Sequence, residues 1–212
     1  MANFATDTFT DSNGVNLPTH DANWVKHGSS GASQLIITDA NRIRVGTTDS
    51  SETIYYHSGS PASADYTVKA DFLKKDDSDG AQMVCGRMST SANTFYAAQY
   101  TRSVSGSTAA WKLFKRVAGT FTQLGSSVNQ TLTVDVAYEG KLSMSGSTIE
   151  LYKEGSGTPS ISTTDTSITA AGKSGLRGTG YVSTNTSSLH LDNFSADDLT
   201  SGTTFTPKVM FM

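Results

Sequence analysis

Short stretches in which apolar and polar residues alternate recur along this chain, and they restrict its fold more than any other feature. In YTVKADFLKK every second residue from Tyr66 to Phe72 is apolar, and TLTVDVAYEG places Leu132, Val134 and Val136 on one face. A period of two residues is typical of half-buried β-strands. The same period runs through TFYAAQYTR, AWKLFKRVAG, STIELYKEG and SLHLDNFSA. No stretch of a dozen residues keeps a helical period, so we predict many strands and almost no helix.

The composition is that of a large, turn-rich β domain. The 212 residues include 30 Ser, 30 Thr and 19 Gly but only 4 Pro, and 36% are hydrophobic, which implies a thin core. Thr favours strands, whereas Ser and Gly supply turns. We find no internal repeat and no linker before Asp198. The sequence therefore predicts one domain over residues 1–198, followed by a tail over residues 199–212.

Charge and cysteine content restrict the partners. The net charge is −3 and the 16 basic residues are spread along the chain, so no stripe for a nucleic acid or a membrane surface is expected. Cys85 is the only cysteine, which excludes an intrachain disulfide. The first ten residues lack the basic and apolar regions of a signal peptide. We expect a chain that folds in a cytoplasm.

The tripeptide Gly172-Lys173-Ser174 matches the end of a phosphate-binding loop. That motif needs a glycine at position 167, where Ser167 stands, and a helix after the tripeptide. Glycines recur through the following residues, GLRGTG, and glycine is unfavourable in a helix. We predict a glycine-rich corner between two strands that binds no nucleotide.

Two ends and the middle of the chain resemble concanavalin A-like (laminin G-like) jelly rolls. The closing segments TDTSITAAGKSGLRGTG and SSLHLDNFSADDL, the opening DTFTDSNGVNLPTHDANWVKHG and the central TLTVDVAYEGKLSMSGSTIELYKEG carry the likeness. It covers about residues 7–198. The resemblance implies an all-β, two-sheet antiparallel jelly-roll sandwich of roughly a dozen strands. It implies little about function, because one fold hosts many functions.

Catalysis and metal binding are not expected. Some relatives of this fold hydrolyse glycans with paired carboxylates, but none of Glu52, Glu139, Glu150 and Glu154 has an Asp two residues later. The metal cluster of legume lectins is absent, and the acidic run 76–80 lacks EF-hand spacing, so we interpret it as a solvated hairpin tip. We predict no catalytic residue, no metal site and no cofactor. A single structural Ca²⁺ held by loop carbonyls, as in some laminin G-like domains, stays open.

Two potentially reactive side chains receive structural interpretations. Cys85 lies in the apolar strand QMVCGRM and is expected to be a buried small hydrophobe rather than a nucleophile. His190 alternates with Leu189 and Leu191 on the last predicted strand. We expect it to face solvent or a polar partner.

Four residues are candidates for glycan binding: Arg87, Tyr96, Tyr100 and Trp111. They fall on neighbouring central strands and could line a concave sheet face, where aromatic rings stack on sugars. The competing interpretation, which we favour for Tyr100 and Trp111, is that these large aromatics belong to the core.

Two functions follow as hypotheses. The first is a non-enzymatic virion protein, a capsid-decoration or fibre-associated jelly roll similar to stand-alone domains of tailed phages, located in the virion. Its partners would be other virion proteins or further copies of itself, with surface glycans as additional ligands. The alternative is a carbohydrate-binding, lectin-like module of a cell-surface or glycan-degrading system.

The end of the tail suggests a partner-binding segment. A polar spacer leads to four consecutive apolar residues, Val209, Met210, Phe211 and Met212. An extended arm of this kind can add a strand to the sheet of a neighbouring molecule. A tail that is disordered or packed on its own domain is the alternative.

Overall fold

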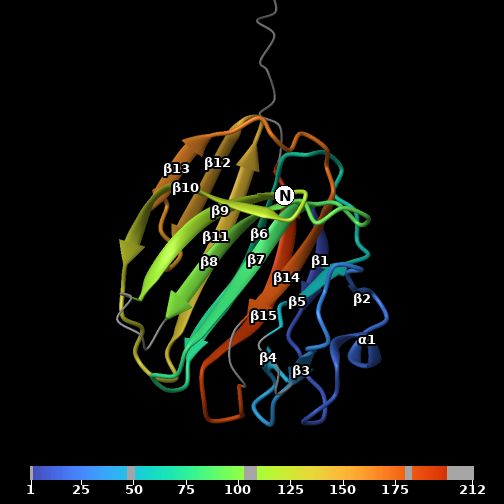
Figure 1. Ribbon diagram of the computed structural model, residues 1–212, viewed down its shortest axis with the longest axis vertical. Coiled ribbons are helices and arrows are strands. Elements are labelled where there is room, and N and C mark those ends of the chain that lie inside the picture. Colours follow the sequence, from blue (N-terminus) through green and yellow to red (C-terminus); the bar gives the residue numbers. More distant parts are fainter. Residues whose placement is uncertain (1, 47–50, 103–108, 180–182, 200–212) are drawn as a thin grey trace, which may run out of the picture.

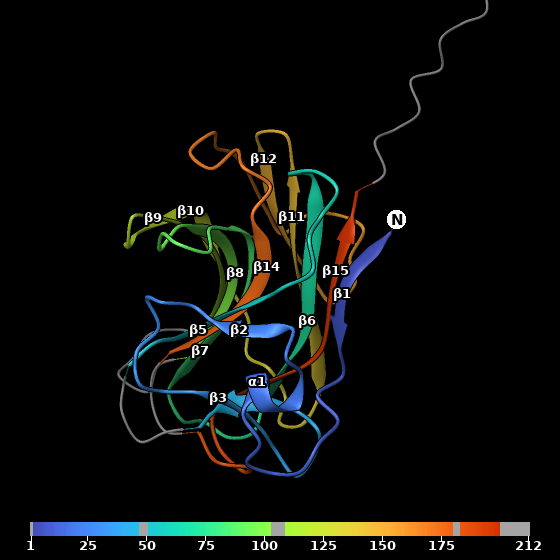
Figure 2. The ribbon, with the colours of Figure 1, turned by 90° about the vertical axis from the view of Figure 1, so that its right-hand side faces the viewer.

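Two antiparallel β-sheets, packed face to face, make up most of the chain (Figure 1). The computed structural model describes residues 2–46, 51–102, 109–179 and 183–199. Figure 2 shows the two layers from the side. The predicted all-β, two-sheet sandwich is thereby confirmed. One helix of a single turn, α1 (Leu17–His20), is capped by the Asn16 side chain, which accepts from the backbone N–H of Thr19 at 3.1 Å.

The first sheet has eight strands. Its order is β13-β12-β11-β6-β15-β4-β3, and β1 pairs with β15. The bounds are β1 (Asn3–Asp7), β3 (Leu35–Ile37), β4 (Ile43–Val45), β6 (Tyr66–Lys74), β11 (Ala137–Ser145), β12 (Thr148–Lys153), β13 (Ile161–Thr164) and β15 (Leu189–Asp198).

The second sheet has seven strands in the order β10-β9-β8-β7-β14-β5-β2. The bounds are β2 (Trp24–Lys26), β5 (Thr53–His57), β7 (Gly80–Met88), β8 (Phe95–Arg102), β9 (Ala110–Val117), β10 (Thr120–Asn129) and β14 (Lys173–Thr179). No helix in the described part of the chain is long and apolar enough to cross a membrane.

The main core lies between the sheets. Its centre includes Trp111 of β9, whose ring meets Phe72 of β6 at 4.9 Å and Tyr100 of β8 at 5.1 Å between centroids. Gly140 of β11 faces this cluster, and a Cβ there would lie 2.6 Å from both Phe72 and Trp111. The indole therefore fits because this position has no side chain.

One predicted strand is wrong. Val134 and Val136 are exposed, and β11 begins only at Ala137. Asp135 has a positive φ of 59°, and the Val136 N–H donates to the Thr133 carbonyl at 3.3 Å, which closes a turn. The turn breaks the alternation, and only Leu132 of the predicted apolar face is buried.

A second, smaller apolar cluster covers the outer face of the seven-stranded sheet. It contains Ile54, Met83, Cys85, Met88, Phe95 and Ala97, with Tyr56 and Phe121 packed against it. The residues between them in sequence, such as Val84 and Ala98, belong to the main core. Strands β7 and β8 are therefore apolar on both faces.

Most of the predicted tail lies outside the described residues. Strand β15 ends at Asp198, and the N–H of Leu199 donates to the Asp65 carbonyl at 3.0 Å. The candidate partner-binding residues Val209, Met210, Phe211 and Met212 are not among the described residues, so the arm stays a prediction.

Candidate functional site

The outer face of the seven-stranded sheet contains a hollow of about 360 Å³. Five strands, β7, β8, β9, β10 and β14, supply its lining. The lining residues are Ala81, Met83, Gln99, Thr101, Phe114, Phe121, Arg177 and Thr179.

Strand register explains why these side chains meet. Gln99 of β8 pairs with Met83 of β7, and Met83 pairs with Arg177 of β14. Residues paired directly across neighbouring strands point to the same face of a sheet. The three therefore form one row across the outer face, and Lys112 of β9 extends the row beyond Gln99.

Two phenylalanine rings give the hollow its apolar part. Phe114 and Phe121 are half-buried and meet edge to face at 5.7 Å between centroids. The Phe121 ring also lies 4.5 Å from the guanidinium of Arg116 and 4.7 Å from that of Arg177. Cations over an aromatic ring are attracted by its quadrupole. The two arginines thus hold Phe121 in place and leave part of both rings open to solvent.

An ion cluster borders these rings. Oε2 of Glu52 accepts from Nη1 of Arg116 at 2.7 Å and from Nε of Arg177 at 2.8 Å. Burial alone would raise the pKa of the Glu52 carboxyl, but the two guanidiniums outweigh it and lower that pKa. Burial lowers the pKa of Arg177. Two positive charges therefore share one carboxylate.

Gln99 has an unused side-chain amide. The residue is 7% exposed, and its amide makes no hydrogen bond to any residue that the structure describes. An amide offers two donor hydrogens and an acceptor oxygen, and neither amide atom of Gln99 is among the fully buried polar atoms without a partner, so the amide is open to the solvent of the hollow. Because Gln99 lines the hollow, a ligand there can satisfy this amide.

The predicted glycan-binding aromatics lie on the opposite side of the same strands. Tyr96, Tyr100 and Trp111 are fully buried between the sheets, so no sugar can stack on them. The hydroxyl of Tyr100 donates to the Gln130 carbonyl at 3.0 Å, and the Trp111 indole donates to the Gln130 side chain at 2.7 Å. The interpretation favoured for Tyr100 and Trp111, that they belong to the core, agrees with this burial, and Tyr96 lies in the core with them.

Arg87 acts as a buried clamp rather than as a surface ligand. Its guanidinium donates to the carbonyls of Ala64, Gly146 and Ile168 at 2.8–2.9 Å and pairs with Asp65 at 3.4 Å. It therefore joins three separate loops. Arg87 also borders a larger pocket of about 630 Å³ at the loop end of the sandwich. That pocket has hydroxyl groups in its lining but no aromatic ring.

The corner at Gly172 agrees with the prediction made from its sequence. Gly172 has a φ of +59°, and β14 begins at Lys173, so a strand and not a helix follows the tripeptide. Nζ of Lys173 donates to the Ser58 carbonyl and to the Ser60 hydroxyl, both at 2.6 Å. The helix that a phosphate loop requires is thus missing.

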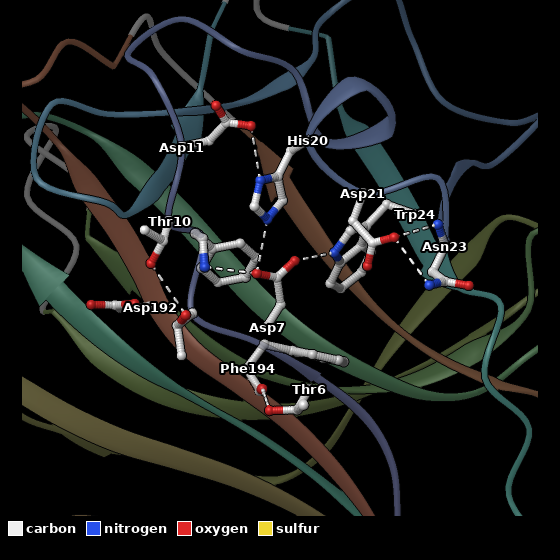
Figure 3. A network of polar contacts seen from close by, with 12 residues as sticks. Thr6, Asp7, Thr10, Asp11, His20, Asp21, Asn23, Trp24, Asp192 and Phe194 are labelled. Atoms are coloured by element: carbon white, nitrogen blue, oxygen red, sulfur yellow. Dashed lines mark hydrogen bonds and ion pairs between the residues drawn. The ribbon is translucent and has the colours of Figure 1, made fainter.

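A network of polar contacts connects β1, α1 and β2 (Figure 3). The Asp7 carboxylate accepts from the Phe9 N–H at 2.7 Å, the His20 ring at 3.0 Å and the Trp24 indole at 2.6 Å. Burial lowers the pKa of His20, but Asp7 and Asp11 outweigh it, so the pKa is raised. All these groups have partners within the protein, which favours a structural role.

The predictions for Cys85 and His190 are both resolved by burial. Cys85 is completely buried, and burial raises the pKa of its thiol to about 12, which confirms the small-hydrophobe interpretation. His190 is also buried, and its Nε2 lies 2.9 Å from the Thr184 carbonyl. Of the two environments expected for His190, solvent or a polar partner, the structure shows the polar partner.

The acidic run 76–80 makes contacts within the protein. The Asp76 side chain accepts from the N–H groups of Ser78 and Ser188 at 2.9 and 2.7 Å, and Asp77 pairs with Lys74 at 3.0 Å and with Arg102. Among the residues that the structure describes, no three His, Cys, Asp or Glu side chains are grouped so that they could hold a metal ion. The residues present therefore provide no side-chain set for the metal of a legume-type lectin.

Among known proteins, the chain is similar to solved structures of the same fold. No protein-family model matches the chain, and no curated protein matches it. Among solved structures, it is similar to a carbohydrate-binding module, CBM66, from Bacillus subtilis (TM-score 0.59, 19% identity, covering 83% of this chain and 96% of that one). It is also similar to the exoplasmic/lumenal domain of VIP36 in its Ca²⁺/Man-bound form (0.56, 12%, 86% and 85%).

A third similar structure is a protein from Mycobacterium abscessus named as a β-glucanase (TM-score 0.60, 9% identity, covering 92% of this chain and all of that one). The fold is a lectin-like jelly roll. At these identities the likeness shows the fold alone, and the three names include a binding module, a lumenal domain and an enzyme. Function must therefore be argued from the residues of the hollow.

Sequence reasoning did not identify the residues of the hollow, although two of them carry a signal. Gln99 follows two alanines in FYAAQY, and Arg177 lies between Leu176 and Gly178 in SGLRG, so each interrupts a run of small or apolar residues. A polar residue at a buried position needs a partner, and an isolated one marks a position worth testing. Phe114 and Phe121 carry no comparable signal, because phenylalanine is common in any strand.

Proposed function

We propose that this chain is a non-catalytic carbohydrate-binding module and that the hollow of the seven-stranded sheet is its site. The observation that carries the proposal is the side-chain amide of Gln99, which has no partner among the described residues and lines the same hollow as two half-buried phenyl rings. Ligand sites typically combine apolar and aromatic walls with a few well-placed polar groups. The similarity in fold to a carbohydrate-binding module supports the proposal.

The chemistry of a sugar matches this lining. A pyranose has an apolar face of C–H groups and a rim of hydroxyls. The C–H face would lie on the half-buried Phe114 ring, and the hydroxyls would bond to the Gln99 amide and the Thr101 and Thr179 hydroxyls. The amide can donate to one hydroxyl and accept from its neighbour. A fully apolar ligand would leave these groups unsatisfied.

Hydrolysis in the hollow is not supported, because its lining contains no carboxylate. Glu52 stands beside the hollow, but both arginines lower its pKa and keep it ionised, so it cannot serve as a general acid near neutral pH. Glycosidases usually need two carboxyl groups on either side of the scissile bond. The only carboxylate described beside the hollow is paired with two arginines, which favours binding of a glycan over its hydrolysis.

The virion role and the attachment arm stay predictions. None of the three similar structures named above is a virion protein, and the arm falls on residues outside the described ones. A virion component could itself carry a glycan-binding jelly roll. The two proposals are therefore compatible.

A glycan array followed by calorimetry on the best ligand tests the proposed function. Phe114→Ala should weaken binding at least tenfold, about 1.4 kcal/mol, because it removes the stacking surface. Tyr152→Ala is the matched control, since Tyr152 is a half-buried aromatic residue on the other sheet. The proposal is wrong if no glycan binds, or if both substitutions leave the affinity unchanged.

A further inference from the structure

The hollow carries more positive charge than its surroundings compensate. Arg177 lines it, Arg116 borders it, and Lys112 stands next to Gln99 on the same face. Glu52 is the only acidic group that pairs with the two arginines among the described residues, and it accepts from both through one oxygen. The chain as a whole has a net charge of −3. The hollow is therefore locally positive although the whole chain is negatively charged.

The guanidinium of Arg177 is also incompletely bonded. Its Nε and Nη2 are directed to Oε2 of Glu52, at 2.8 and 2.7 Å. Among the described residues, its Nη1 has only the sulfur of Met83, at 3.4 Å, as an acceptor. A thioether is a weak acceptor, and a poorly bonded N–H on a side chain only 9% exposed is unfavourable. An anionic oxygen in the hollow would give this N–H a strong partner.

Charge, direction and the Gln99 amide point to the same ligand. Arg177 and Gln99 flank Met83 in one row of the sheet, so a group placed above Met83 can reach donors on both sides. Neighbouring strands lie about 4.8 Å apart, so the two Cα positions are separated by roughly 10 Å, a span suited to one sugar unit. A neutral hydroxyl can use these donors, but only an anionic group also balances the charge.

We propose that the hollow selects glycans that carry an anionic group, the carboxylate of a uronic acid or a sulfate ester, and that Arg177 binds this group. The inference rests on the proposed function, since it names the class of glycan bound at the same site. Lys112 adds attraction from the edge of the row without direct contact. Phe114 and Gln99 would bind acidic and neutral sugars alike.

Matched ligand pairs separate the acidic group from the rest of the sugar. Calorimetry would compare a tetragalacturonate with its fully methyl-esterified form, and a sulfated galactan oligosaccharide with its desulfated form, at 50 mM and 500 mM NaCl. We expect at least one acidic form to bind tenfold or more tightly than its neutral partner at low salt. The preference should shrink at high salt, where charges are screened.

Two substitutions assign the effect to residues. Arg177→Met leaves Glu52 and Arg116 as a balanced pair, and should abolish the preference while the neutral form still binds. Lys112→Gln, at a half-buried surface position, should reduce the preference for acidic over neutral glycans about two- to threefold. If Arg177→Met does not fold, this second variant tests the proposal.

The outcomes distinguish the two proposals. If neutral glycans bind as tightly as acidic ones and Phe114→Ala still removes binding, the hollow is a sugar site and the anionic inference is wrong. If acidic glycans bind better but Arg177→Met and Lys112→Gln keep the full preference, the assignment to this row is overturned. If no glycan binds in any arm, both proposals fail together.

Discussion

The outer faces of the two sheets differ in how their charged groups are balanced. On the eight-stranded sheet, Nζ of Lys69 meets Glu139 at 2.8 Å, and the Asn193 amide donates to Asp71 at 2.8 Å. On the seven-stranded sheet, two guanidiniums share the single carboxylate of Glu52, and the Gln99 amide, which lines the hollow, has no partner among the described residues. Lys69 and Glu139 balance each other, whereas the charge beside the hollow is not balanced by the residues around it. An unbalanced charge beside an apolar surface favours binding of a ligand.

Removing one glutamate from each face should produce the largest contrast. Glu52→Gln leaves Arg116 and Arg177, 11% and 9% exposed, without a carboxylate, and should cost about 3–4 kcal/mol of unfolding free energy. Glu139→Gln breaks a pair with Lys69, which is 39% exposed, and should cost less than about 1 kcal/mol. Urea denaturation of both variants measures the difference. Equal losses would show that the two faces are electrostatically alike.

The eight-stranded sheet contains a buried histidine, His190, which should make the unfolding free energy depend on pH. Burial, helped by Lys75, Arg42 and Arg44, lowers the pKa of His190 to about 4 from an ordinary value near 6.5. Between pH 6.5 and 4, His190 is protonated in the unfolded chain but stays neutral in the folded chain. The stability due to neutral His190 is therefore complete above pH 6.5 and is lost as the pH falls toward 4, about 2–3 kcal/mol in all.

The His190 contribution must be measured against a His190 variant, because His20 changes the unfolding free energy with pH in the opposite direction. The pKa of His20 is raised by Asp7 and Asp11, so its protonation stabilises the fold below pH 6.5 and the gain disappears as the pH rises. The unfolding free energies of the wild type and His190→Gln should be measured from pH 7.5 to 4. The wild type should lose more stability than the variant over this range. Parallel curves would mean that His190 titrates normally in the folded chain.

The fold could be predicted from sequence because its signals are local. Alternation in YTVKADFLKK and STIELYKEG is a property of each strand, and the turn at Gly146, with a φ of 54°, follows from a Ser-Gly-Ser segment. The segment 131–136 failed because the left-handed conformation of Asp135 interrupts a pattern that looks continuous in sequence. Periodicity records which residues share a face but not where the backbone turns.

The site could not be predicted in the same way, because alternation does not say which face meets the other sheet. In β8 the apolar residues Phe95 and Ala97 point outward while Tyr96 and Tyr100 point into the main core. A strand that is apolar on both faces carries only a weak periodic signal. The choice between faces depends on packing against strands distant in sequence, such as β6 and β11, and that information is not local.

The smallest effect concerns two cation–aromatic contacts of similar distance. Nζ of Lys141 lies 4.2 Å from the Tyr152 ring on the eight-stranded sheet, and the Arg116 guanidinium lies 4.5 Å from the Phe121 ring beside the hollow. Distance alone would make the two contacts equivalent. Lys141 and Tyr152 are both partly exposed, so water screens their attraction and Lys141→Met should cost only about 0.5 kcal/mol.

The same substitution should leave glycan affinity unchanged, because Lys141 lies on the sheet without the hollow. In 1 M NaCl the loss in unfolding free energy should disappear, since exposed charges are then screened within about 3 Å. Thermal and urea unfolding at low and high salt measure it. A loss above about 1.5 kcal/mol, or one that persists in salt, would mean that this contact is as desolvated as the one beside the hollow. The two faces would then differ in the balance of their charges, and no longer in how strongly water screens those charges.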